Sequence, residues 1–534
     1  MRPCSHHGLV GRLRLSSMLR LFMPSRHMLG STHMLRAAAT VRSMLLWSAL
    51  SAAVGIGGAS SQPLAAQEPS GLQAAIVLEQ VVVKAIERSE ASVVSIARFN
   101  PESAARDIPQ VMFPRPGMQF VDPLSSQNPT NPDFVPNAFA TGVVVDKAGF
   151  IVTNFHAVKG DGEIWVTTTA KRPMRAVITG ADNRSDLAVL KVQSPPEDVT
   201  FTPITFGDAS KLKKGQIVLA LGNPYAIARD GQASASWGII ANISRKSAPN
   251  KDAEDARDKK NTIHHFGTLI QTDAKLNLGT SGGALLNLQG EMIGLTTSQA
   301  AVAGFEQSAG YAVPVDDLFL RIVDTLKQGK EVEYGLLGVS GAPLSSAERR
   351  AGMQGVRIDS VRGGSPAERA GIFPRDVITH VAGHPINDVD GLMLQIGKQP
   401  AGKPTIVSIE HDGRVTTKTV TLAKYEVRGK NIVTSPRPTW RGMHVDFPSS
   451  HPELDPQFNQ GLRLAAPCVL VVEIDANSKA WAAGIRRGML ITHIDNVAVE
   501  SPDEFTAQAA KTRGTVELRI EALPGQPPVV KVEE

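Results

Sequence analysis

An internal repeat near the C-terminus is the feature that most restricts what this chain can fold into. Residues 365–372 read SPAERAGI and are followed by VITHV, and 113 positions later residues 478–485 read SKAWAAGI and are followed by LITHI. Each copy continues into a candidate helix and then into alternating strands. In the second copy, the spacing of Ser501 and Glu504 predicts a capping box, with Pro502 at the first helical position. We therefore expect two related modules, over residues 335–425 and 440–530, joined by a Pro-rich linker near 434–440.

The stretch before the repeat has the pattern of an all-β domain. From Thr141 to about Pro314, short Val/Ile/Leu runs alternate with Gly, Asp, Asn and Pro, as in GVVVDKAGFIVT and QIVLALGNP. Many short strands with frequent turn signals favour a sandwich or a barrel. The spacing within Val315–Gln328 predicts a closing helix, and Gln73–Arg98 combines a helical pattern with the strand-like VVSIAR. Residues 99–139 are rich in Pro, Asn and Ser, which predicts a long loop that is either functional or disordered.

The N-terminus has the composition of a processing signal. Residues 1–67 contain seven Arg and no Asp, Glu or Lys, and an apolar run from Met44 to Ile56 precedes small residues ending in LAAQ. This order is typical of a secretory signal peptide, so we expect a leader over residues 1–66 and an exported protein of the periplasm or cell envelope. An uncleaved anchor and an organelle transit peptide are the alternatives, and translation from a later methionine such as Met34 is another open point.

Charge and cysteine content exclude some partners. The chain carries 56 Lys and Arg against 51 Asp and Glu, but without the leader the balance is 49 against 51, or −2. The basic character therefore belongs to the leader, and a nucleic-acid partner is not implied. Of the two cysteines, Cys4 lies in the leader and Cys468 lies in an apolar run, so neither a disulfide framework nor a cysteine-based metal site is expected.

Three residues of the β-rich region could form a serine nucleophile with its base. His156 ends the strand pattern FIVTNFHAV, Asp186 begins the one in NRSDLAVLKV, and Ser281 lies in LNLGTSGGALL. A serine hydroxyl needs an adjacent base, and that base needs a third group to orient it. Taken singly, each residue has an ordinary structural explanation: a serine in a glycine-rich turn, a satisfied polar residue at a strand end, and a carboxylate that caps a turn.

Taken together, the blocks resemble one family. GVVVDKAGFIVTNFHAV, NRSDLAVLKV and IQTDAKLNLGTSGGALLNLQGEMIGLTT resemble the signature blocks of HtrA/DegP-type serine proteases, and SPAERAGI and SKAWAAGI resemble the block before the second helix of PDZ domains. The order His, Asp, Ser is that of chymotrypsin. The resemblance covers roughly residues 75–530. It implies a mainly β chain, with a chymotrypsin-like double β-barrel over 75–330 followed by two small α+β PDZ domains.

The resemblance also assigns roles to the motif residues. Ser281 would attack the scissile carbonyl, His156 would accept its proton and pass it to the leaving amine, and Asp186 would orient the imidazole. The backbone of Gly279, Thr280 and Ser281 would form the oxyanion hole. Many family members have Asn where this chain has Thr280; because the contribution there is mainly from the backbone, we expect no loss.

Substrate preference is implied in part. Trypsin-like enzymes that bind basic side chains carry an acid six residues before the nucleophile, where this chain has Lys275. By resemblance, Leu276 would line the S1 pocket, with the loop at 297–310 as its other side, so small or aliphatic P1 residues are expected.

The PDZ modules would bind extended peptides by strand addition, with the terminal carboxylate held by backbone N–H groups. In the first module, the carboxylate loop would be Gly335–Val339, which makes Leu336, Leu337, Gly338 and Val339 the peptide-binding residues. Arg441–Val445 occupies the corresponding place in the second module but lacks the later glycine, and Met489 replaces the acid found at Asp376. Peptide binding by the second module is therefore open, with a role in assembly as the alternative.

The remaining segments add regulation but no cofactor. The charged stretch 246–260 is either a solvated loop or the counterpart of the family's sensor loop, and 99–139 corresponds to the loop that covers the site in resting relatives. His264 and His265 have no acidic or Cys partner at ligand spacing, so no metal is expected. No phosphate-binding loop of the GxxxxGK[ST] type is present.

The expected function is an ATP-independent endoprotease that degrades unfolded or misfolded exported proteins. Its partners would be unfolded polypeptides and C-terminal peptides bound by the PDZ domains, and a trimer-based homo-oligomer is a family expectation. The alternatives are a catalytically silent chaperone or PDZ scaffold that retains the protease fold, and a hydrolase of other acyl substrates.

Overall fold

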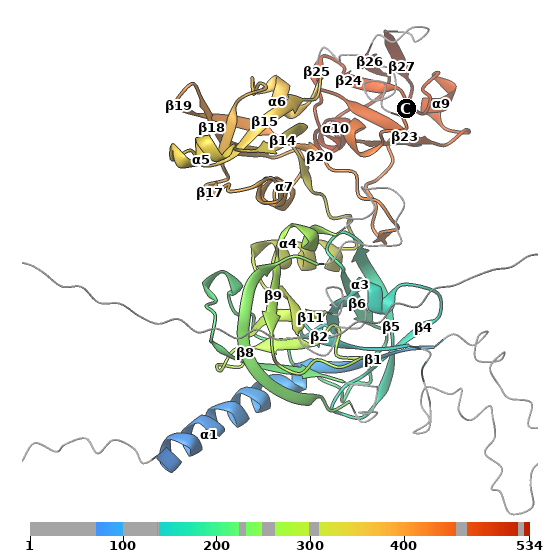
Figure 1. Ribbon diagram of the computed structural model, residues 1–534. Helices are drawn as coiled ribbons and strands as arrows, with labels where there is room; N and C mark the ends of the chain where they lie inside the picture. Colours follow the sequence, from blue (N-terminus) through green and yellow to red (C-terminus); the bar gives the residue numbers. More distant parts are fainter. Residues whose placement is uncertain are drawn as a thin grey trace, which may run out of the picture. The chain divides into compact units, whose positions relative to one another are not determined.

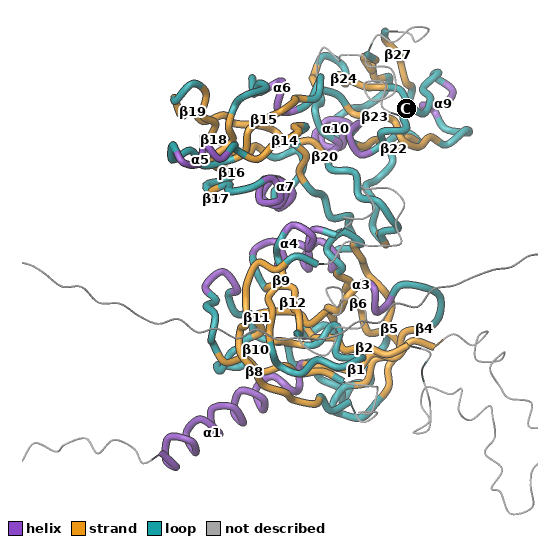
Figure 2. Tube along the Cα trace, in the orientation of Figure 1, coloured by secondary structure: helices purple, strands orange, loops and turns teal. Residues whose placement is uncertain are grey.

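The computed structural model describes residues 71–99, 136, 138–223, 231–247, 262–297, 309–454, 467–521 and 528–534. Residues Pro69–Glu534 form one compact unit, distinct from Met1–Glu68. The predicted leader lies outside the described residues, as does nearly all of the predicted covering loop. Strands dominate the described part of the chain (Figure 2), which confirms the prediction of a mainly β protein.

The first barrel is closed by the pairing of the two strands at the ends of its strand order. Its strands are β1 Val93–Phe99, β2 Ala138–Val144, β3 Phe150–Asn154, β4 Glu163–Thr167, β5 Pro173–Asp182 and β6 Leu187–Val192. The order along the sheet is β5-β4-β1-β2-β3-β6, and β6 also pairs with β5, so no edge of the ring is left open. A seventh strand, β21 Ile432–Val433, comes from much later in the chain and pairs with β5 on the outside of the ring.

The second barrel is also a closed ring of six strands (Figure 1). It consists of β7 Ile217–Gly222, β8 Ser234–Arg245, β9 Leu269–Thr272, β10 Ala284–Leu286, β11 Met292–Thr297 and β12 Gly310–Pro314. Their order around the ring is β10-β11-β12-β9-β8-β7. The predicted double β-barrel is therefore confirmed. Short helical turns connect strands of the two barrels at α3 Phe155–Val158, η3 Ala209–Lys211 and η6 Ile263–Phe266, and η1 Glu90–Ser92 leads into β1.

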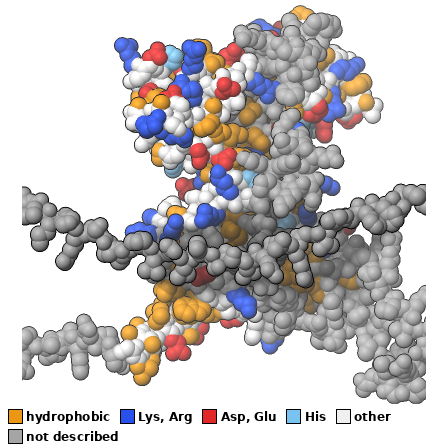
Figure 3. Space-filling model, viewed as in Figure 1, with side chains coloured by type: hydrophobic (Ala, Val, Ile, Leu, Met, Phe, Trp, Pro, Cys, Tyr) orange, Lys and Arg blue, Asp and Glu red, His pale blue; other side chains and the backbone are white. Residues whose placement is uncertain are grey.

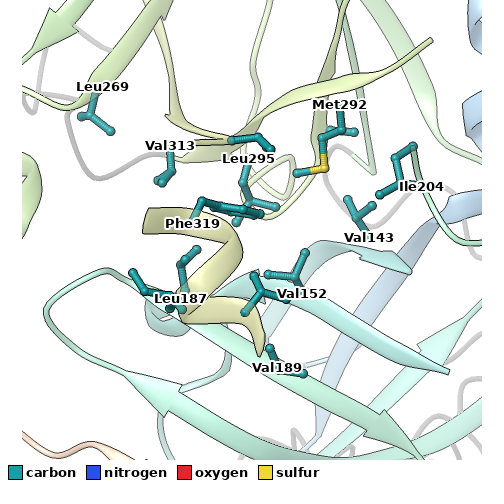
Figure 4. Close-up of a cluster of buried hydrophobic side chains, with 14 of the residues drawn as sticks. Val143, Val152, Leu187, Val189, Ile204, Leu269, Met292, Leu295, Val313 and Phe319 are labelled. Atoms are coloured by element: carbon teal, nitrogen blue, oxygen red, sulfur yellow. The ribbon is translucent and has the colours of Figure 1, made fainter. Parts of the chain in front are cut away.

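The main hydrophobic core lies between the barrels and beneath one helix. The helix predicted at Val315–Gln328 is present as α4 Asp317–Lys327, and the side chain of Asp316 caps it by accepting from the Phe319 N–H. Figure 4 shows Phe319 among side chains of both barrels, and only 1% of its surface is exposed. Apart from Phe319 and Ile204, which lies between β6 and β7, the core residues labelled there come from β2, β3 and β6 of the first barrel and from β9, β11 and β12 of the second.

The N-terminal helix differs from the other elements in its exposure. The helical pattern predicted within Gln73–Arg98 is present as α1 Gly71–Ser89, followed by β1. Ser89 ties its end to the second barrel by donating to the carbonyl of Gly290. The rest of the helix is largely exposed, including Leu72 and Val77, and hydrophobic side chains gather on it in Figure 3. In the described residues, no helix combines the length and the hydropathy needed to cross a membrane.

The two C-terminal modules have the same strand order. The first contains β14 Val339–Pro343, β15 Val356–Val361, β16 Val377–Val381, β17 His384–Pro385, β18 Pro404–His411 and β19 Arg414–Thr421, with helices α5 Ser346–Arg350, α6 Pro366–Arg369 and α7 Val389–Lys398. The second contains β22 Met443–Asp446, β23 Val469–Ile474, β24 Leu490–Ile494, β25 Val497–Ala498, β26 Val516–Ile520 and β27 Val529–Val532, with η7 Pro448–Ser450, α9 Lys479–Ala482 and α10 Pro502–Ala509. Their sheets run β14-β15-β16-β18-β19 and β22-β23-β24-β26-β27. The pair β13 Gly335–Leu336 and β20 Ala423–Lys424 joins the start of the first module to its end.

The repeated residues have matching structural roles. Ser365 and Ser478 each cap a one-turn helix, accepting from the N–H groups of Glu368 and Trp481. Gly371 and Gly484 follow these helices with φ of 67° and 98°, a region that favours glycine. The first shared Ala and the shared Ile positions are fully buried in both modules: Ala367, Ile372 and Ile378, and Ala480, Ile485 and Ile491.

The carboxylate-loop alignment of the second module needs one correction. Gly338 and Gly442 both have φ of 83°, and an added Cβ would lie 2.3 Å from the Ser365 Cβ in one module and 2.1 Å from the Ser478 Cβ in the other. Gly442 is thus the counterpart of the later glycine, and the glycine that the second module lacks is the earlier one, at Gly335. Register at a loop with few shared residues is poorly determined by sequence.

Candidate active site

Asp186 and His156 form a close pair at one end of the first barrel. The Nδ1 atom of His156 lies 2.7 Å from Oδ2 of Asp186, and the backbone N–H of His156 donates to Oδ1 at 2.9 Å. The Asp186 side chain is 1% exposed, whereas that of His156 is 24% exposed. A buried carboxylate therefore fixes the ring through Nδ1, with the ring itself partly accessible.

Strand pairing explains why these two residues meet. Strands β3 and β6 are antiparallel partners, and Asn154 at the end of β3 pairs with Leu187 at the start of β6. The residues just beyond these ends are neighbours, and the Phe155 N–H donates to the Asp186 carbonyl at 2.9 Å. Asp186 has φ of 56°, which is unusual for a residue other than glycine and turns the chain sharply into β6.

Ser281 lies on a tight turn between β9 and β10. The Thr280 N–H donates to the Asn277 carbonyl at 3.1 Å, and the Gly283 N–H donates to the Thr280 carbonyl at 2.9 Å. Gly282 has φ of 84°, and a Cβ there would lie 2.1 Å from the carbonyl oxygen of Thr141. Glycine is therefore required at 282 by both conformation and space.

This turn packs on the strands that lead to His156. The Thr141 N–H in β2 donates to the Ser281 carbonyl at 2.9 Å. A Cβ at Gly282 would also lie 2.3 Å from Oγ1 of Thr153, a residue of β3 that precedes His156 by three positions. Ser281 of the second barrel is thereby brought to the end of the first barrel where His156 and Asp186 lie.

A hydrogen bond from Thr141 fixes the backbone before Ser281. Gly279 has φ of 95°, its carbonyl accepts from Oγ1 of Thr141 at 2.8 Å, and that same Oγ1 accepts from the Asn223 N–H at 2.8 Å. The Thr280 N–H is already used inside the turn, so Gly279 and Ser281 are the stronger candidates for hole donors. The Thr280 hydroxyl also donates to the Asn277 carbonyl, at 2.6 Å.

Sequence reasoning missed three threonines that hold this turn. Thr141 fixes the Gly279 carbonyl, the Thr153 hydroxyl donates to the Thr141 carbonyl at 2.7 Å, and the Thr296 hydroxyl donates to the Thr280 carbonyl at 2.5 Å. All three are at most 1% exposed. Their signal in the sequence is a polar β-branched residue inside an otherwise apolar strand, which is also common in strands without a site.

Leu276 packs against β12 beside the turn. A Cβ built on Gly310, the first residue of β12, would lie 2.7 Å from Cδ1 of Leu276. Leu276 also contacts the apolar interior of the second barrel, and Lys275 beside it is exposed. Of the predicted second side of this pocket, residues 298–308 lie outside the described part of the chain.

The predicted peptide-binding residues of the first module are distributed over two environments. Leu337 is 2% exposed and packs in the module's core, so it can reach a peptide only through its backbone. Leu336 pairs with Ala423, and Val339 begins β14. The Gly338 carbonyl accepts from the Arg362 N–H at 2.9 Å.

The histidine pair of η6 is used structurally. His264 is buried; its Nε2 lies 2.8 Å from the Ser185 carbonyl and its Nδ1 lies 2.7 Å from the Thr268 hydroxyl. Burial lowers the pKa of His264, so the ring is neutral and its Nε2–H donates to Ser185. Among the described residues, no group of three or more His, Cys, Asp or Glu is placed to hold a metal ion.

Known proteins resemble both parts of the chain. The family model of the trypsin-like peptidase domain matches residues 140–295, and that of the PDZ domain matches residues 335–422. A probable DegP-like periplasmic serine endoprotease of Chlamydia trachomatis is 30% identical over 381 residues, which cover 70% of this chain and 70% of that protein. The periplasmic serine endoprotease DegP of Salmonella typhimurium is 31% identical over 290 residues, covering 53% and 57%. A solved structure of the HtrA-type protease AlgW with a tripeptide aligns with a TM-score of 0.46 at 24% identity, covering 64% of this chain and 97% of that one.

Proposed function

This chain belongs to the HtrA/DegP family of serine endoproteases, and we propose that Ser281, His156 and Asp186 are its catalytic triad. The observation that carries the proposal is the pairing of His156 with a buried carboxylate through Nδ1, at 2.7 Å. Because Nδ1–H is held there, Nε2 is left as the basic nitrogen that could accept the proton of Ser281. The same Nε2 would then protonate the leaving amine.

We further propose that the N–H groups of Gly279 and Ser281 stabilise the oxyanion. Support comes from the Thr280 carbonyl, which shares its peptide unit with the Ser281 N–H and accepts from the Thr296 hydroxyl at 2.5 Å and from the Gly283 N–H at 2.9 Å. Donors that are fixed before the reaction cost no reorganisation when charge develops, and one such donor is typically worth about 3 kcal/mol. Leu276, packed against Gly310, would limit the depth of the S1 pocket and favour small or aliphatic P1 residues.

The proposed substrates are unfolded or misfolded proteins of the periplasm, cleaved without ATP. The curated relatives are named as periplasmic endoproteases, and the first PDZ module supplies a sheet edge at β14 that suits strand addition by a peptide end. Peptide occupancy of that module would regulate cleavage.

The test compares the full-length chain with Ser281→Ala on a permanently unfolded protein, such as reduced and alkylated casein, and on a folded protein, both without nucleotide. We expect cleavage of the unfolded protein by the wild type and none by Ser281→Ala. Suppression of substrate aggregation by both proteins, without cleavage by either, would contradict the protease proposal and favour a silent chaperone.

A further inference from the structure

Arg184, two residues before Asp186, is buried in an unusual way. It is 1% exposed, and it is among the largest fully buried side chains of the described residues. An arginine stays charged inside a protein and is normally paired with a carboxylate when buried. Among the described residues Nε has no hydrogen-bond partner, and the guanidinium lies over two aromatic rings, with Cζ 5.2 Å from the ring centre of Tyr334 and 3.9 Å from that of Tyr425.

The two tyrosines belong to the start and the end of the first PDZ module. Tyr334 directly precedes β13, Tyr425 directly follows β20, and these two strands pair with each other. The Tyr425 N–H donates to the Tyr334 carbonyl at 2.8 Å, so the backbones of the two residues are held side by side. An arginine of the protease domain therefore contacts both points at which the chain enters and leaves the module.

Tyr334 also contacts the loop that carries the triad carboxylate. Its hydroxyl donates to Oδ2 of Asp182, which accepts from the Ser185 N–H at 2.8 Å and from the Ser185 hydroxyl at 2.5 Å. Burial raises the pKa of Tyr334 well above its ordinary value, so the phenol is the donor. The Ser185 carbonyl in turn accepts from His264.

This loop needs such support because Asp186 has a strained backbone. A residue other than glycine is rarely found at φ of 56° and persists there only where the surroundings impose it. On one side, Phe155 and His156 hydrogen-bond to Asp186. On the other side, the Asp182 carboxylate holds the neighbouring Ser185 by accepting its N–H and its hydroxyl. Arg184, which contacts Tyr334 and Tyr425, belongs to the same segment.

We propose that Arg184 is a positioning residue for the triad carboxylate, and that Tyr334 and Tyr425 make its position depend on the placement of the first PDZ module. The inference rests on the proposed catalytic role of Asp186. Helix α7 of the same module adds to the contact, because a Cβ at Gly397 would lie 3.5 Å from the Arg184 guanidinium. A shift of the β13–β20 pair or of α7 relative to the barrels would change the surroundings of Arg184 directly.

The test compares two substitutions of one residue in the full-length protein. Tyr425→Phe keeps the aromatic face that covers the guanidinium, whereas Tyr425→Leu removes it. A short chromogenic peptide serves as substrate, and the rate is divided by the number of active sites titrated with a fluorophosphonate. We expect kcat per active site to fall about 10–100-fold in Tyr425→Leu with KM nearly unchanged, as for a small displacement of a catalytic group. Tyr425→Phe should keep kcat per active site at the wild-type value.

Two further results keep the inference falsifiable. A merely structural role would reduce the number of titratable sites while kcat per site stayed equal in the Leu and Phe variants, and that result would overturn the proposal. If the wild type neither hydrolyses peptides nor reacts with the fluorophosphonate, the proposed function has failed. The far-downfield proton resonance of the His156 Nδ1–H bond to Asp186 still decides in that case. Its loss or shift in Tyr425→Leu alone supports positioning, and the same resonance in all three proteins refutes it.

Discussion

Replacing Asp186 with Asn tests how the triad histidine is oriented. The wild-type carboxylate accepts two bonds from His156, one from the backbone N–H and one from Nδ1–H. An amide has only one oxygen. Because the backbone N–H can only donate, that oxygen takes the place of Oδ1, and the NH₂ group faces Nδ1 across 2.7 Å. In the opposite orientation the NH₂ group would face the backbone N–H of His156, and two donors opposed at a buried site cost about 1–3 kcal/mol.

The amide therefore reverses the tautomer of His156. Nδ1 becomes the acceptor, Nε2 carries the proton, and the ring can no longer accept the proton of Ser281. We expect kcat to fall about 10⁴-fold, the size of effect known when a triad carboxylate is replaced by its amide. Peptide hydrolysis and the rate of fluorophosphonate labelling should fall together, while the melting temperature changes little because the side-chain shape is kept.

The first PDZ module contains a matched control. Asp376 is also buried, accepts a backbone N–H from Phe373 at 2.8 Å with one oxygen, and contacts Nδ1 of His411 at 2.6 Å with the other. Asp376→Asn should leave hydrolysis of a short peptide within about twofold of wild type, because this pair is far from any proposed chemistry. The tautomer argument would be refuted if folded Asp186→Asn lost less than about tenfold in kcat, or if Asp376→Asn lost as much kcat as Asp186→Asn.

Three further perturbations have defined outcomes. Gly279→Ala should lower kcat about 10²–10³-fold in rate assays, because its Cβ would lie 2.6 Å from the Asn223 carbonyl and displace a proposed oxyanion donor; unchanged kcat would exclude that role. Leu276→Ala should raise kcat/KM for Phe over Val at P1 by about tenfold in a peptide panel, since the pocket deepens; an unaltered ratio would remove Leu276 from S1. Burial lowers the pKa of His264 in the folded state, whereas in the unfolded chain the ring takes up a proton at about pH 6.5. The contribution of neutral His264 to the free energy of unfolding is therefore complete above that pH and is lost as the pH falls below it. His264→Gln should therefore flatten the drop in melting temperature between about pH 7 and pH 5, and an identical drop would contradict this assignment.

The strand pattern predicted an all-β sandwich or barrel, the resemblance to HtrA/DegP proteases implied two barrels, and the repeat predicted the two modules. Closed barrels leave alternating or continuous apolar strands separated by turns, and that pattern is visible in sequence. The repeat could be interpreted because its shared residues have local roles, such as the capping Ser365 and the buried Ile372. The two-residue strand β21 was not predicted, because Ile432 and Val433 form too short an apolar run beside a Pro-rich segment.

The contacts of Arg184 could not be predicted for a different reason. Arg is mostly exposed in proteins, so an arginine beside a strand is read as a surface residue. Its aromatic partners lie about 150 and 240 positions later in the chain, and no periodic pattern links such distant positions. The same holds for Thr141 and Thr153, whose importance follows from their hydrogen bonds and from the close approach of Gly282, a residue of the other barrel, to their oxygens.

The central claim is that Ser281 is a nucleophile activated by His156, and covalent labelling tests it most directly. The full-length protein is treated with a fluorophosphonate and the labelled peptide is mapped by mass spectrometry, with Ser281→Ala and His156→Ala as controls. We predict one label per chain, on Ser281, that is absent in the first variant and strongly slowed in the second. Absence of Ser281 labelling in every oligomeric and peptide-activated state, or labelling that persists in Ser281→Ala, would contradict the claim.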